Sequence, residues 1–223
     1  MSDIKKYAVL VAGGKGMRMG NALPKQFLPL AGLPVLTHSL RTFIKAIPGI
    51  QIILVLPTDQ FSYAQIVLQS LDNAVDIQIV GGGETRFHSV QNGLNAIQEP
   101  GIVFVHDGAR PLVSEALILR CLHQAIDKGS AIPAIPVTDS MRIIDEDDSE
   151  PVNRDNLRII QTPQTFNTNI ILPAFMTAYS ADFTDEATVV EASGIPVFLV
   201  EGERRNIKVT TPEDMIIAEA LLK

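Results

Sequence analysis

Short apolar runs recur along the chain, and segments with a helical repeat separate them. These runs are rich in β-branched residues and span 7–11, 50–56, 75–80, 102–106, 131–137 and 195–200. The helical repeats comprise Val35, Leu36, Leu40, Phe43, Ile44 and Ile47, then Val90, Leu94 and Ile97, and then Ala116, Leu119 and Leu122. Because strands that are apolar on both faces alternate with helices, the pattern predicts an α/β fold with a mostly parallel sheet covered on both sides.

One segment interrupts this alternation. Residues 138–161 carry apolar patches at 141–144 and 157–160, on either side of an acidic stretch of turn-forming residues. This pattern predicts a β-hairpin that stands out from the sheet. It is either an exposed excursion or a dimerisation arm, since long loops tend to carry function or disorder. We expect a single domain over residues 1–223, with 138–161 as its projecting arm.

The composition limits the class of partner. The 223 residues carry 18 Lys and Arg against 25 Asp and Glu, a formal net charge of −7, so a general electrostatic grip on nucleic acid or on an anionic membrane is not expected. A bound anion must therefore meet a local cluster of cations. Cys121 is the single cysteine, and the sequence shows neither a leader pattern nor a long apolar span, so we expect a cytoplasmic protein.

A glycine-rich loop, "AGGKGMRMGNALPKQF", follows the first apolar run. Loops of this kind at the carboxyl edge of a parallel sheet bind phosphates, because glycine lets backbone N–H groups approach an anion. A P-loop is excluded because Gly14 and Lys15 are followed by Gly16 in place of Ser or Thr. A dinucleotide fingerprint is disfavoured, because Gly20 comes one residue too late and 31–35 contains no acid.

Three cations lie among or just after these glycines. Lys15, Arg18 and Lys25 concentrate positive charge in a net acidic chain, and Pro24 restricts the backbone just before Lys25. Such a cluster suits a ligand with several phosphates. The alternative is a glycine-rich turn with solvated basic residues, and for an isolated loop that alternative is favoured. The later motifs must decide between the two.

Two later motifs follow predicted strands. In "GGGETRFHSV" the glycines leave room for a flat base, and Ser89 could hydrogen-bond near it, although a turn with a helix cap fits as well. In "VHDGARP" the side chains of Asp107 and Arg110 emerge at the same sheet edge as the glycine loop. A carboxylate there more often faces a ligand or a metal than a structural partner. His106 and His123 are interpreted as packed or solvated residues.

Towards the carboxyl terminus the signals are weaker. Thr184, Asp185 and Glu186 are interpreted as helix-capping residues, with acids at the positive end of the dipole. Lys208 lies in a strand-like apolar run, where an unpaired cation is costly, so we expect an anionic partner for it. The sequence has no Cys and His cluster for zinc and no Gly-x-Ser-x-Gly elbow for an acyl nucleophile.

Taken together, six motifs resemble the cytidylyltransferases that make 4-diphosphocytidyl-2-C-methyl-D-erythritol in the non-mevalonate isoprenoid pathway. They are "AGGKGMRMGNALPKQFL", "GGGETRFHSV", "VHDGARP", "TPQTF", "TDEA" and "NIKVTTPEDM", in the family's order over residues 8–215. The resemblance implies a Rossmann-like fold of the nucleotide-diphospho-sugar transferase type, with a β-arm that builds a homodimer. It also implies transfer of CMP from CTP to 2-C-methyl-D-erythritol 4-phosphate, with release of pyrophosphate. Mg²⁺ is the implied cofactor, held mainly by the CTP phosphates, with Asp107 as a candidate ligand.

The resemblance also implies roles for individual residues. The implied catalytic residues are Arg18, Lys25, Arg154 and Lys208. The CTP site corresponds to Ala12, Gly13, Gly14, Lys15, Gly16, Gly82 and Ser89. The acceptor site corresponds to Asp107, Arg110, Ser140, Arg154, Thr162, Thr184 and Lys208. Arg154 lies on the predicted arm, so we expect it to reach the neighbouring subunit's site. Lys15 is either a phosphate contact or a solvated residue of the turn.

Two departures from the family pattern are visible. Ser140 stands where many relatives have Thr, which keeps the hydroxyl and loses a methyl contact. The segment 81–89 is one residue longer than in some relatives, so the glycine that contacts the base is not fixed by the motif.

Three other functions were compared with this one. Ribitol 5-phosphate cytidylyltransferases share "PKQF", "QTPQ" and "NIKVTTP", but "TDEA" and "ETRFHSV" favour methylerythritol. A nicotinamide oxidoreductase is disfavoured by the failed fingerprint. A non-catalytic nucleotide-binding module would keep the fold without needing both Arg18 and Lys25, so their joint presence argues for catalysis.

Overall fold

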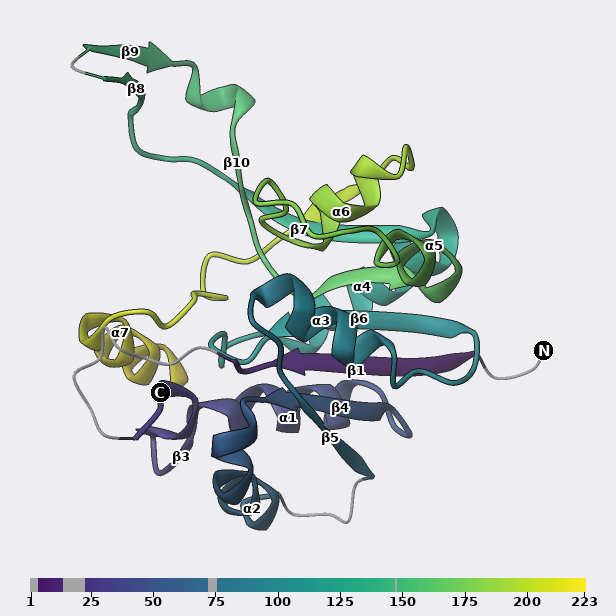
Figure 1. Ribbon diagram of the computed structural model, residues 1–223. Coiled ribbons are helices and arrows are strands. Elements are labelled where there is room, and N and C mark those ends of the chain that lie inside the picture. The colour runs from purple at the N-terminus through teal and green to yellow at the C-terminus, as the bar shows by residue number, and fades with distance from the viewer. Residues whose placement is uncertain (1–3, 14–22, 72–75, 147) are drawn as a thin grey trace.

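An eight-stranded sheet forms the centre of the molecule (Figure 1). The computed structural model describes residues 4–13, 23–71, 76–146 and 148–223. Its strands lie in the order β10-β7-β11-β6-β1-β4-β5, and β12 pairs with β7. The strands span Lys5–Val11 (β1), Gln51–Leu56 (β4), Ile77–Gly81 (β5), Gly101–Asp107 (β6), Ser130–Pro136 (β7), Arg158–Ile160 (β10), Gln164–Asn167 (β11) and Leu199–Glu201 (β12). Each of the six predicted apolar runs contributes a strand to this sheet.

Parallel pairing dominates one half of the sheet. β1 pairs in parallel with β4 and β6, and β4 pairs in parallel with β5. β11 is antiparallel to both β6 and β7, and the pattern of apolar runs did not predict it. Its sequence, QTFN, is too short and too polar to register as a strand, although Gln164, Thr165 and Phe166 are all buried. The α/β class and the mostly parallel sheet are confirmed.

Helices cover both faces of the sheet, as the alternating pattern predicted. They span Val35–Ala46 (α1), Phe61–Gln69 (α2), Arg86–Leu94 (α3), Glu115–Lys128 (α4), Thr168–Ala174 (α5), Glu186–Ala192 (α6) and Pro212–Leu222 (α7). On one face, α1, α2 and α4 pack against strand residues such as Leu10, Leu54 and Phe104. On the other face, α3, α5 and α6 pack against the alternate residues of the same strands, such as Val9 and Val105. Each parallel strand is therefore buried on both sides.

The predicted buried face of α4 is confirmed at Leu122 and wrong at the other two positions. Ala116 and Leu119 are exposed, and the helix buries Leu117, Ile118, Cys121 and Ala125 beside Leu122. Ser114 caps the helix by accepting a hydrogen bond from the Leu117 N–H group. The apolar stripe of α4 thus repeats at 117, 118, 121, 122 and 125, which is a better helical period than the three-residue spacing used for the prediction.

The projecting hairpin is present, but its strand pairing differs from the prediction. Strand β8 (Met141–Asp145) pairs with β9 (Asp148–Val152) in a separate two-stranded sheet that stands clear of the main body (Figure 1). The second apolar patch instead becomes β10, which returns to the main sheet beside β7, after the short helix η4 (Arg154–Asn156). We use "the arm" for residues 138–157. None of the helices in the described part of the chain combines the length and apolar character needed to cross a membrane.

Candidate active site

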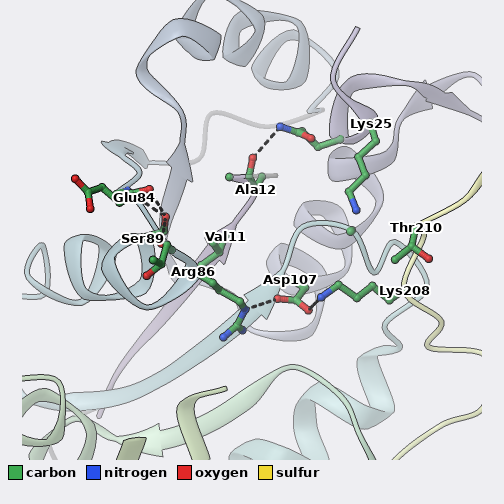
Figure 2. Close-up of a pocket in the computed structure, with 14 residues that line it drawn as sticks. Val11, Ala12, Lys25, Glu84, Arg86, Ser89, Asp107, Lys208 and Thr210 are labelled. Carbon is green, nitrogen blue, oxygen red and sulfur yellow. Dashed lines mark hydrogen bonds and ion pairs between the residues drawn. The ribbon is translucent and has the colours of Figure 1, made fainter. Parts of the chain in front are cut away.

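Two cavities lie at the carboxyl ends of β1 and β6, where the parallel strands deliver their loops. The first, shown in Figure 2, has a volume of about 300 Å³. It is lined by Val11, Ala12, Gly13, Lys25, Gln26, Gly83, Glu84, Thr85, Arg86, Ser89, Asp107, Ala109, Lys208 and Thr210. The second has a volume of about 240 Å³ and is lined by Arg86, Asp107, Arg110, Ile160, Gln161, Thr162, Gln164, Thr184, Asp185 and Lys208. Arg86, Asp107 and Lys208 line both cavities, and we call these three residues the junction.

In the first cavity, the two glycine-rich segments meet at Ser89. A Cβ atom at Gly82 would lie 3.3 Å from the Ser89 Oγ atom, and one at Gly13 would lie 3.5 Å from it. The Ser89 hydroxyl donates to the Thr85 carbonyl over 3.0 Å and accepts from the Gly83 N–H over 3.1 Å. The hydroxyl proton is therefore used inside the loop, and Ser89 shapes the cavity wall while keeping acceptor capacity for a ligand.

Lys25 enters the first cavity from a short helix, η2 (Lys25–Phe27), as Figure 2 shows. Its Nζ atom donates to the Val209 carbonyl over 3.1 Å, next to Lys208 in the chain. The buried Gln26 amide donates to the Ala12 carbonyl over 2.8 Å, which ties η2 to the end of β1. Sequence reasoning did not single out Gln26, whose position beside Lys25 fixes that lysine relative to the glycine loop.

At the junction, Arg86 and Lys208 approach the Asp107 carboxylate from opposite sides (Figure 2). Arg86 Nε lies 3.1 Å from Asp107 Oδ1, and Lys208 Nζ lies 2.8 Å from Asp107 Oδ2. Arg110 Nε is 3.9 Å from the same Oδ2 atom. Burial raises the pKa of Asp107, but the charges of Arg86, Lys208 and Arg110 outweigh it and hold that pKa well below its usual range. The anionic partner expected for Lys208 is Asp107, although residues 206–210 form no strand.

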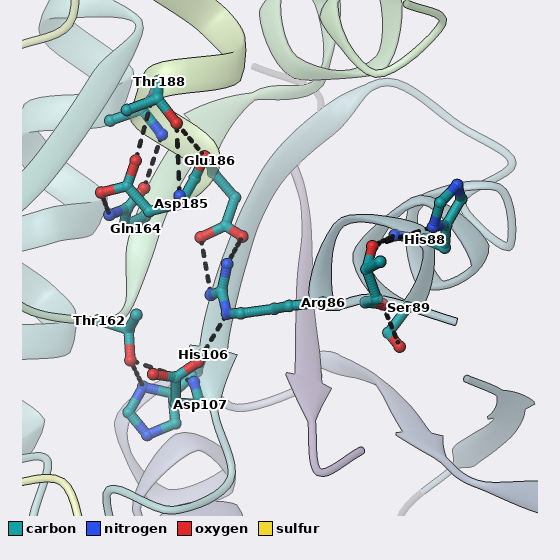
Figure 3. Close-up of polar contacts among 12 residues, drawn as sticks. Arg86, His88, Ser89, His106, Asp107, Thr162, Gln164, Asp185, Glu186 and Thr188 are labelled. Carbon is teal, nitrogen blue, oxygen red and sulfur yellow. Dashed lines mark hydrogen bonds and ion pairs between the residues drawn. The ribbon is translucent and has the colours of Figure 1, made fainter. Parts of the chain in front are cut away.

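Glu186 holds the other side of Arg86. Its two carboxylate oxygens accept from Arg86 Nη1 over 2.6 Å and from Nη2 over 3.1 Å, so the pair is bidentate (Figure 3). Glu186 is fully buried, and burial raises its pKa while the Arg86 guanidinium opposes that shift. Burial lowers the pKa of Arg86, but the carboxylates of Glu186 and Asp107 more than offset this and raise it above its ordinary value. Arg86 is therefore a fixed cation at any ordinary pH.

A buried histidine supports the junction from behind. His106 Nε2 lies 3.1 Å from the Arg110 carbonyl oxygen, and His106 Nδ1 lies 3.1 Å from the Thr162 hydroxyl oxygen. Because the carbonyl can only accept, Nε2 carries the proton, and Thr162 donates to Nδ1. The same Thr162 oxygen accepts from the Asp107 N–H over 3.1 Å. Burial lowers the pKa of His106 to about 4, so it is neutral and packed, as its sequence context indicated.

The site residues predicted from the sequence divide into three groups by where the structure places them. Ala12, Gly13, Lys25, Ser89, Asp107, Arg110, Thr162, Thr184 and Lys208 line one or both cavities, and Gly82 adjoins Ser89. Gly14, Lys15, Gly16 and Arg18 lie outside the described residues. Ser140 and Arg154 lie on the arm and line neither cavity, and the exposed Arg154 donates to the Thr138 carbonyl over 2.6 Å. Within one described chain, these two residues are therefore not brought to the site.

Sequence reasoning missed Arg86 and Glu186, although both lie in motifs it had singled out. The capping interpretation is correct for Asp185, which forms a capping box with Thr188. It is incomplete for Glu186, which lies three and four residues before the buried Val189 and Val190 and so on the apolar face of α6. An acid on such a face needs a cationic partner. The spacing of Glu186 from Val189 and Val190 was therefore the signal in the sequence that could have identified Glu186 as a buried, paired acid.

The described residues contain no group of three or more His, Cys, Asp or Glu side chains arranged to hold a metal ion. Asp107 is the carboxylate that lines both cavities, and its two oxygens are occupied by Arg86 and Lys208. A magnesium ion would therefore have to draw most of its ligands from a bound substrate and water, which is common for Mg²⁺ bound with phosphates.

Comparison with known proteins gives a consistent result. Residues 7–223 match the family model for 2-C-methyl-D-erythritol 4-phosphate cytidylyltransferase. The chain is 46% identical to proteins of that name from Bacteroides fragilis, over 97% of this chain and 99% of the relative, and from Bacteroides thetaiotaomicron, over 98% and 100%. It resembles the crystal structure of 4-diphosphocytidyl-2C-methyl-D-erythritol synthase from Anaerococcus prevotii, with 31% identity, a TM-score of 0.83 and 98% of each chain covered. It also resembles the Thermus thermophilus cytidylyltransferase, with 32% identity, a TM-score of 0.76, and 96% and 97% covered.

Proposed function

Because this chain belongs to the 2-C-methyl-D-erythritol 4-phosphate cytidylyltransferase family, it is a nucleotidyltransferase of isoprenoid biosynthesis, and we propose that its two cavities divide the two substrates between them. CTP occupies the first cavity and 2-C-methyl-D-erythritol 4-phosphate the second. The observation that carries this assignment is the shared junction, because two cavities with a common cationic wall allow two anionic substrates to meet there.

In the reaction, an oxygen of the acceptor phosphate attacks the α-phosphorus of CTP. A bond forms between them, the bond from the α-phosphorus to the bridging oxygen of the β-phosphate breaks, and pyrophosphate leaves. No protein nucleophile takes part, so the chain must orient the two phosphates and neutralise their charge. Lys25 and Lys208 line the first cavity, where this charge develops. We assign Arg18 to the same task on the resemblance of its motif.

The acceptor is held in the second cavity. Asp107, Thr184 and Arg110 line it and are the groups that contact the hydroxyls of methylerythritol, while Thr162 and Lys208 lie near its phosphate. The Thr162 hydroxyl donates to His106 and accepts from the Asp107 N–H, so Thr162 shapes the cavity wall beside the phosphate and Lys208 supplies the charge that meets it. Lys208 bridges both substrates because it lines both cavities.

Mg²⁺ is part of this proposal. The triphosphate would supply most of its ligands, and Asp107, the carboxylate that lines both cavities, would complete them. When bound, the ion neutralises charge on the triphosphate and on the departing pyrophosphate. A ligand role for Asp107 would require one of its two basic partners to move, and Lys208 is the more exposed of them.

We further propose a homodimer built by the arm. The arm exposes Met141, Ile143 and Ile144, apolar side chains that a second subunit would cover. Arg154 and Ser140 would then complete the partner's acceptor site, which explains why neither reaches a cavity of its own chain. A cytoplasmic location is also proposed, supported by a composition with a single cysteine.

Pyrophosphate release tests the activity. CTP is mixed with methylerythritol phosphate or with ribitol 5-phosphate, each with Mg²⁺ present or chelated. We expect release with methylerythritol phosphate and Mg²⁺, little release with ribitol phosphate, and a large loss on chelation. Release with ribitol phosphate alone would overturn the acceptor assignment, and release that is insensitive to chelation would overturn the role of Mg²⁺.

Mixed dimers test the shared site. Lys25→Ala chains and Arg154→Ala chains should each keep little activity on their own. In a symmetric dimer with sites shared between subunits, an equal mixture of the two chains restores one intact site in half of the dimers, or about a quarter of wild-type activity. Separate purification of the mixed species by two affinity tags makes the measurement direct. No recovery in the tagged heterodimer would confine each site to one chain.

A further inference from the structure

The bidentate ion pair between Arg86 and Glu186 adjoins the junction and has no role in the proposed reaction. The pair joins the first residue of α3 to the first residue of α6, 100 positions apart in sequence. Figure 3 shows Arg86 reaching from α3 to a position between Glu186 and Asp107. A buried ion pair that serves only the fold could often be replaced, both partners together, by apolar side chains without loss of stability. Its place beside both cavities suggests a different role.

Arg86 retains capacity for a ligand. A guanidinium has five N–H donors, and the contacts with Asp107 and Glu186 use three of them, one from Nε, one from Nη1 and one from Nη2, which leaves 5 − 3 = 2. The Arg86 side chain is 30% exposed, whereas the Glu186 side chain is 0% exposed. The guanidinium therefore has a fixed plane, an accessible edge and unused donors, which is the arrangement that suits a phosphate.

We propose that Arg86 is a further catalytic residue that binds the phosphate of the acceptor, and that Glu186 is a positioning residue that fixes the plane of the Arg86 guanidinium. The proposal rests on the assignment of the acceptor to the second cavity. Arg86 lines that cavity together with Thr184 and Asp185, so its side chain reaches the acceptor's side of the junction. The ligand class is a phosphate monoester, whose charge two N–H donors and the nearby Lys208 can share.

The charges of the junction and of the adjoining Arg110 and Glu186 are consistent with this role. Arg86, Arg110 and Lys208 bring three positive charges, and Asp107 and Glu186 bring two negative ones, so the group is net positive by one before any substrate binds. Without Glu186 the three cations would face a single carboxylate and repel one another. With it, they are held close together and still attract an anion. Glu186 thus keeps a cationic wall rigid in the absence of substrate.

Steady-state kinetics of three variants, Arg86→Lys, Glu186→Gln and the double variant, test the proposal. Arg86→Lys keeps the positive charge and loses the planar guanidinium with its paired N–H donors. It should lower kcat roughly 10- to 100-fold and raise KM for the acceptor, while KM for CTP stays within about twofold of wild type. Glu186→Gln keeps the shape and releases the guanidinium, and it should show the same pattern with a loss of about 10-fold. Because Glu186 acts through Arg86, the double variant should lose little more than Arg86→Lys alone.

Glu203→Gln is the matched control. Glu203 pairs with Arg120 outside both cavities, and its side chain is also largely buried, so this variant should lose some stability and keep both KM values. If Glu186 were purely structural, Glu186→Gln would behave in the same way, and its effect would add to that of Arg86→Lys. Either result would overturn the proposal. If Glu186→Gln does not fold, Arg86→Lys decides, because an unchanged KM for the acceptor would exclude Arg86.

Wild-type protein measured in parallel separates the two levels of the proposal. If it releases no pyrophosphate with methylerythritol phosphate, the proposed function falls and the role of Arg86 with it. If wild type is active and the variants keep its kinetic constants, the proposed function stands and the role of Arg86 and Glu186 is wrong.

Discussion

The junction and the arm are built on opposite principles. At the junction, Arg86, Asp107 and Lys208 each have a counter-charge within 4 Å from a distant part of the same chain, and both Asp107 and the adjoining Glu186 are buried. On the arm, Ile143 and Ile144 are 62% and 70% exposed, and β8 contacts β9 without packing on the main body. The junction is complete within one chain, whereas the arm presents apolar surface that one chain does not cover. The difference separates what a single chain preorganises from what, in the proposed dimer, it would leave to a second subunit.

The sharpest way to break the junction is to remove its shared carboxylate. Asp107→Asn leaves Arg86, Lys208 and Arg110 close together with one counter-charge fewer, and it should lower the free energy of unfolding by about 3–5 kcal/mol, as expected when one partner of a buried ion pair is lost. Denaturant unfolding measures this. The control is Glu115→Gln, which breaks the exposed pair with Lys45 and should cost about 1 kcal/mol or less.

The effect of Asp107→Asn should depend on pH. The folded pKa of Asp107 lies below its unfolded value near 4, so its stabilising contribution is complete above about pH 4 and is lost as the pH falls further. Wild type and variant should therefore converge in stability in acid. A constant difference between them down to low pH would show that the carboxylate charge is not what the three cations require.

His106 supports the junction as a neutral ring, so the stability of the fold should decrease in acid, where the unfolded state binds a proton at this residue. Its folded pKa of about 4 lies below the unfolded value near 6.5, so the unfolded state binds the proton first as the pH falls. Stability should decline between about pH 6.5 and 4, by roughly 3 kcal/mol from this group. His106→Gln should flatten the decline over that window. An equally steep decline in the variant would assign the slope to other groups.

The charge of Lys25 provides the next test of the part of the site that one chain preorganises. Lys25→Ala should lower kcat by about 100-fold, the scale of losing one fixed electrostatic contact in a transition state. Stability should change little, because Lys25 lies at the surface of the first cavity and its Nζ atom donates to a backbone carbonyl. Pyrophosphate release and thermal unfolding, measured on the same preparation, separate the two effects. Unchanged turnover would remove Lys25 from the mechanism.

The arm should give the smallest effect on the chain itself. Ile144→Lys replaces an exposed side chain, so the intrinsic stability of one subunit should stay within about 0.5 kcal/mol of wild type. The sedimentation coefficient should nonetheless shift towards that of a monomer. Ile126→Lys is the control, since Ile126 is 50% exposed on α4 and lies away from the arm. A dimer that survives Ile144→Lys, or an equal loss with Ile126→Lys, would contradict the assignment of the arm.

The parts of the fold that repeat were predictable from sequence, and the parts set by long-range contacts were not. The apolar strands and the helices with a clear repeat follow from local periodicity, so six strands and the helices α1, α3 and α4 were found, whereas α2 and α5 were not. β11 was missed because QTFN has no apolar alternation, and it becomes a strand only between the edges that β6 and β7 supply. The hairpin was predicted, but β9 was not identified as its second strand, because Glu150 and Pro151 of β9 have low β-propensity.

The same distinction applies to the site. Glycine motifs and isolated cations, such as Gly13, Lys25 and Lys208, could be singled out because their residue types are informative wherever they fold. Arg86 and Glu186 could not be paired, since their contact links the starts of two helices 100 residues apart. Local reasoning assigned Glu186 to a helix dipole, which is a property of one helix. Its actual partner depends on how α3 and α6 pack on the sheet.

The common wall of the two cavities also bears on how this enzyme could be inhibited. Under the proposed division of the substrates, a compound confined to one cavity would compete with one substrate and leave the other free to bind. A single molecule with anionic groups in both cavities would contact Arg86 and Lys208 from both sides and compete with both substrates at once.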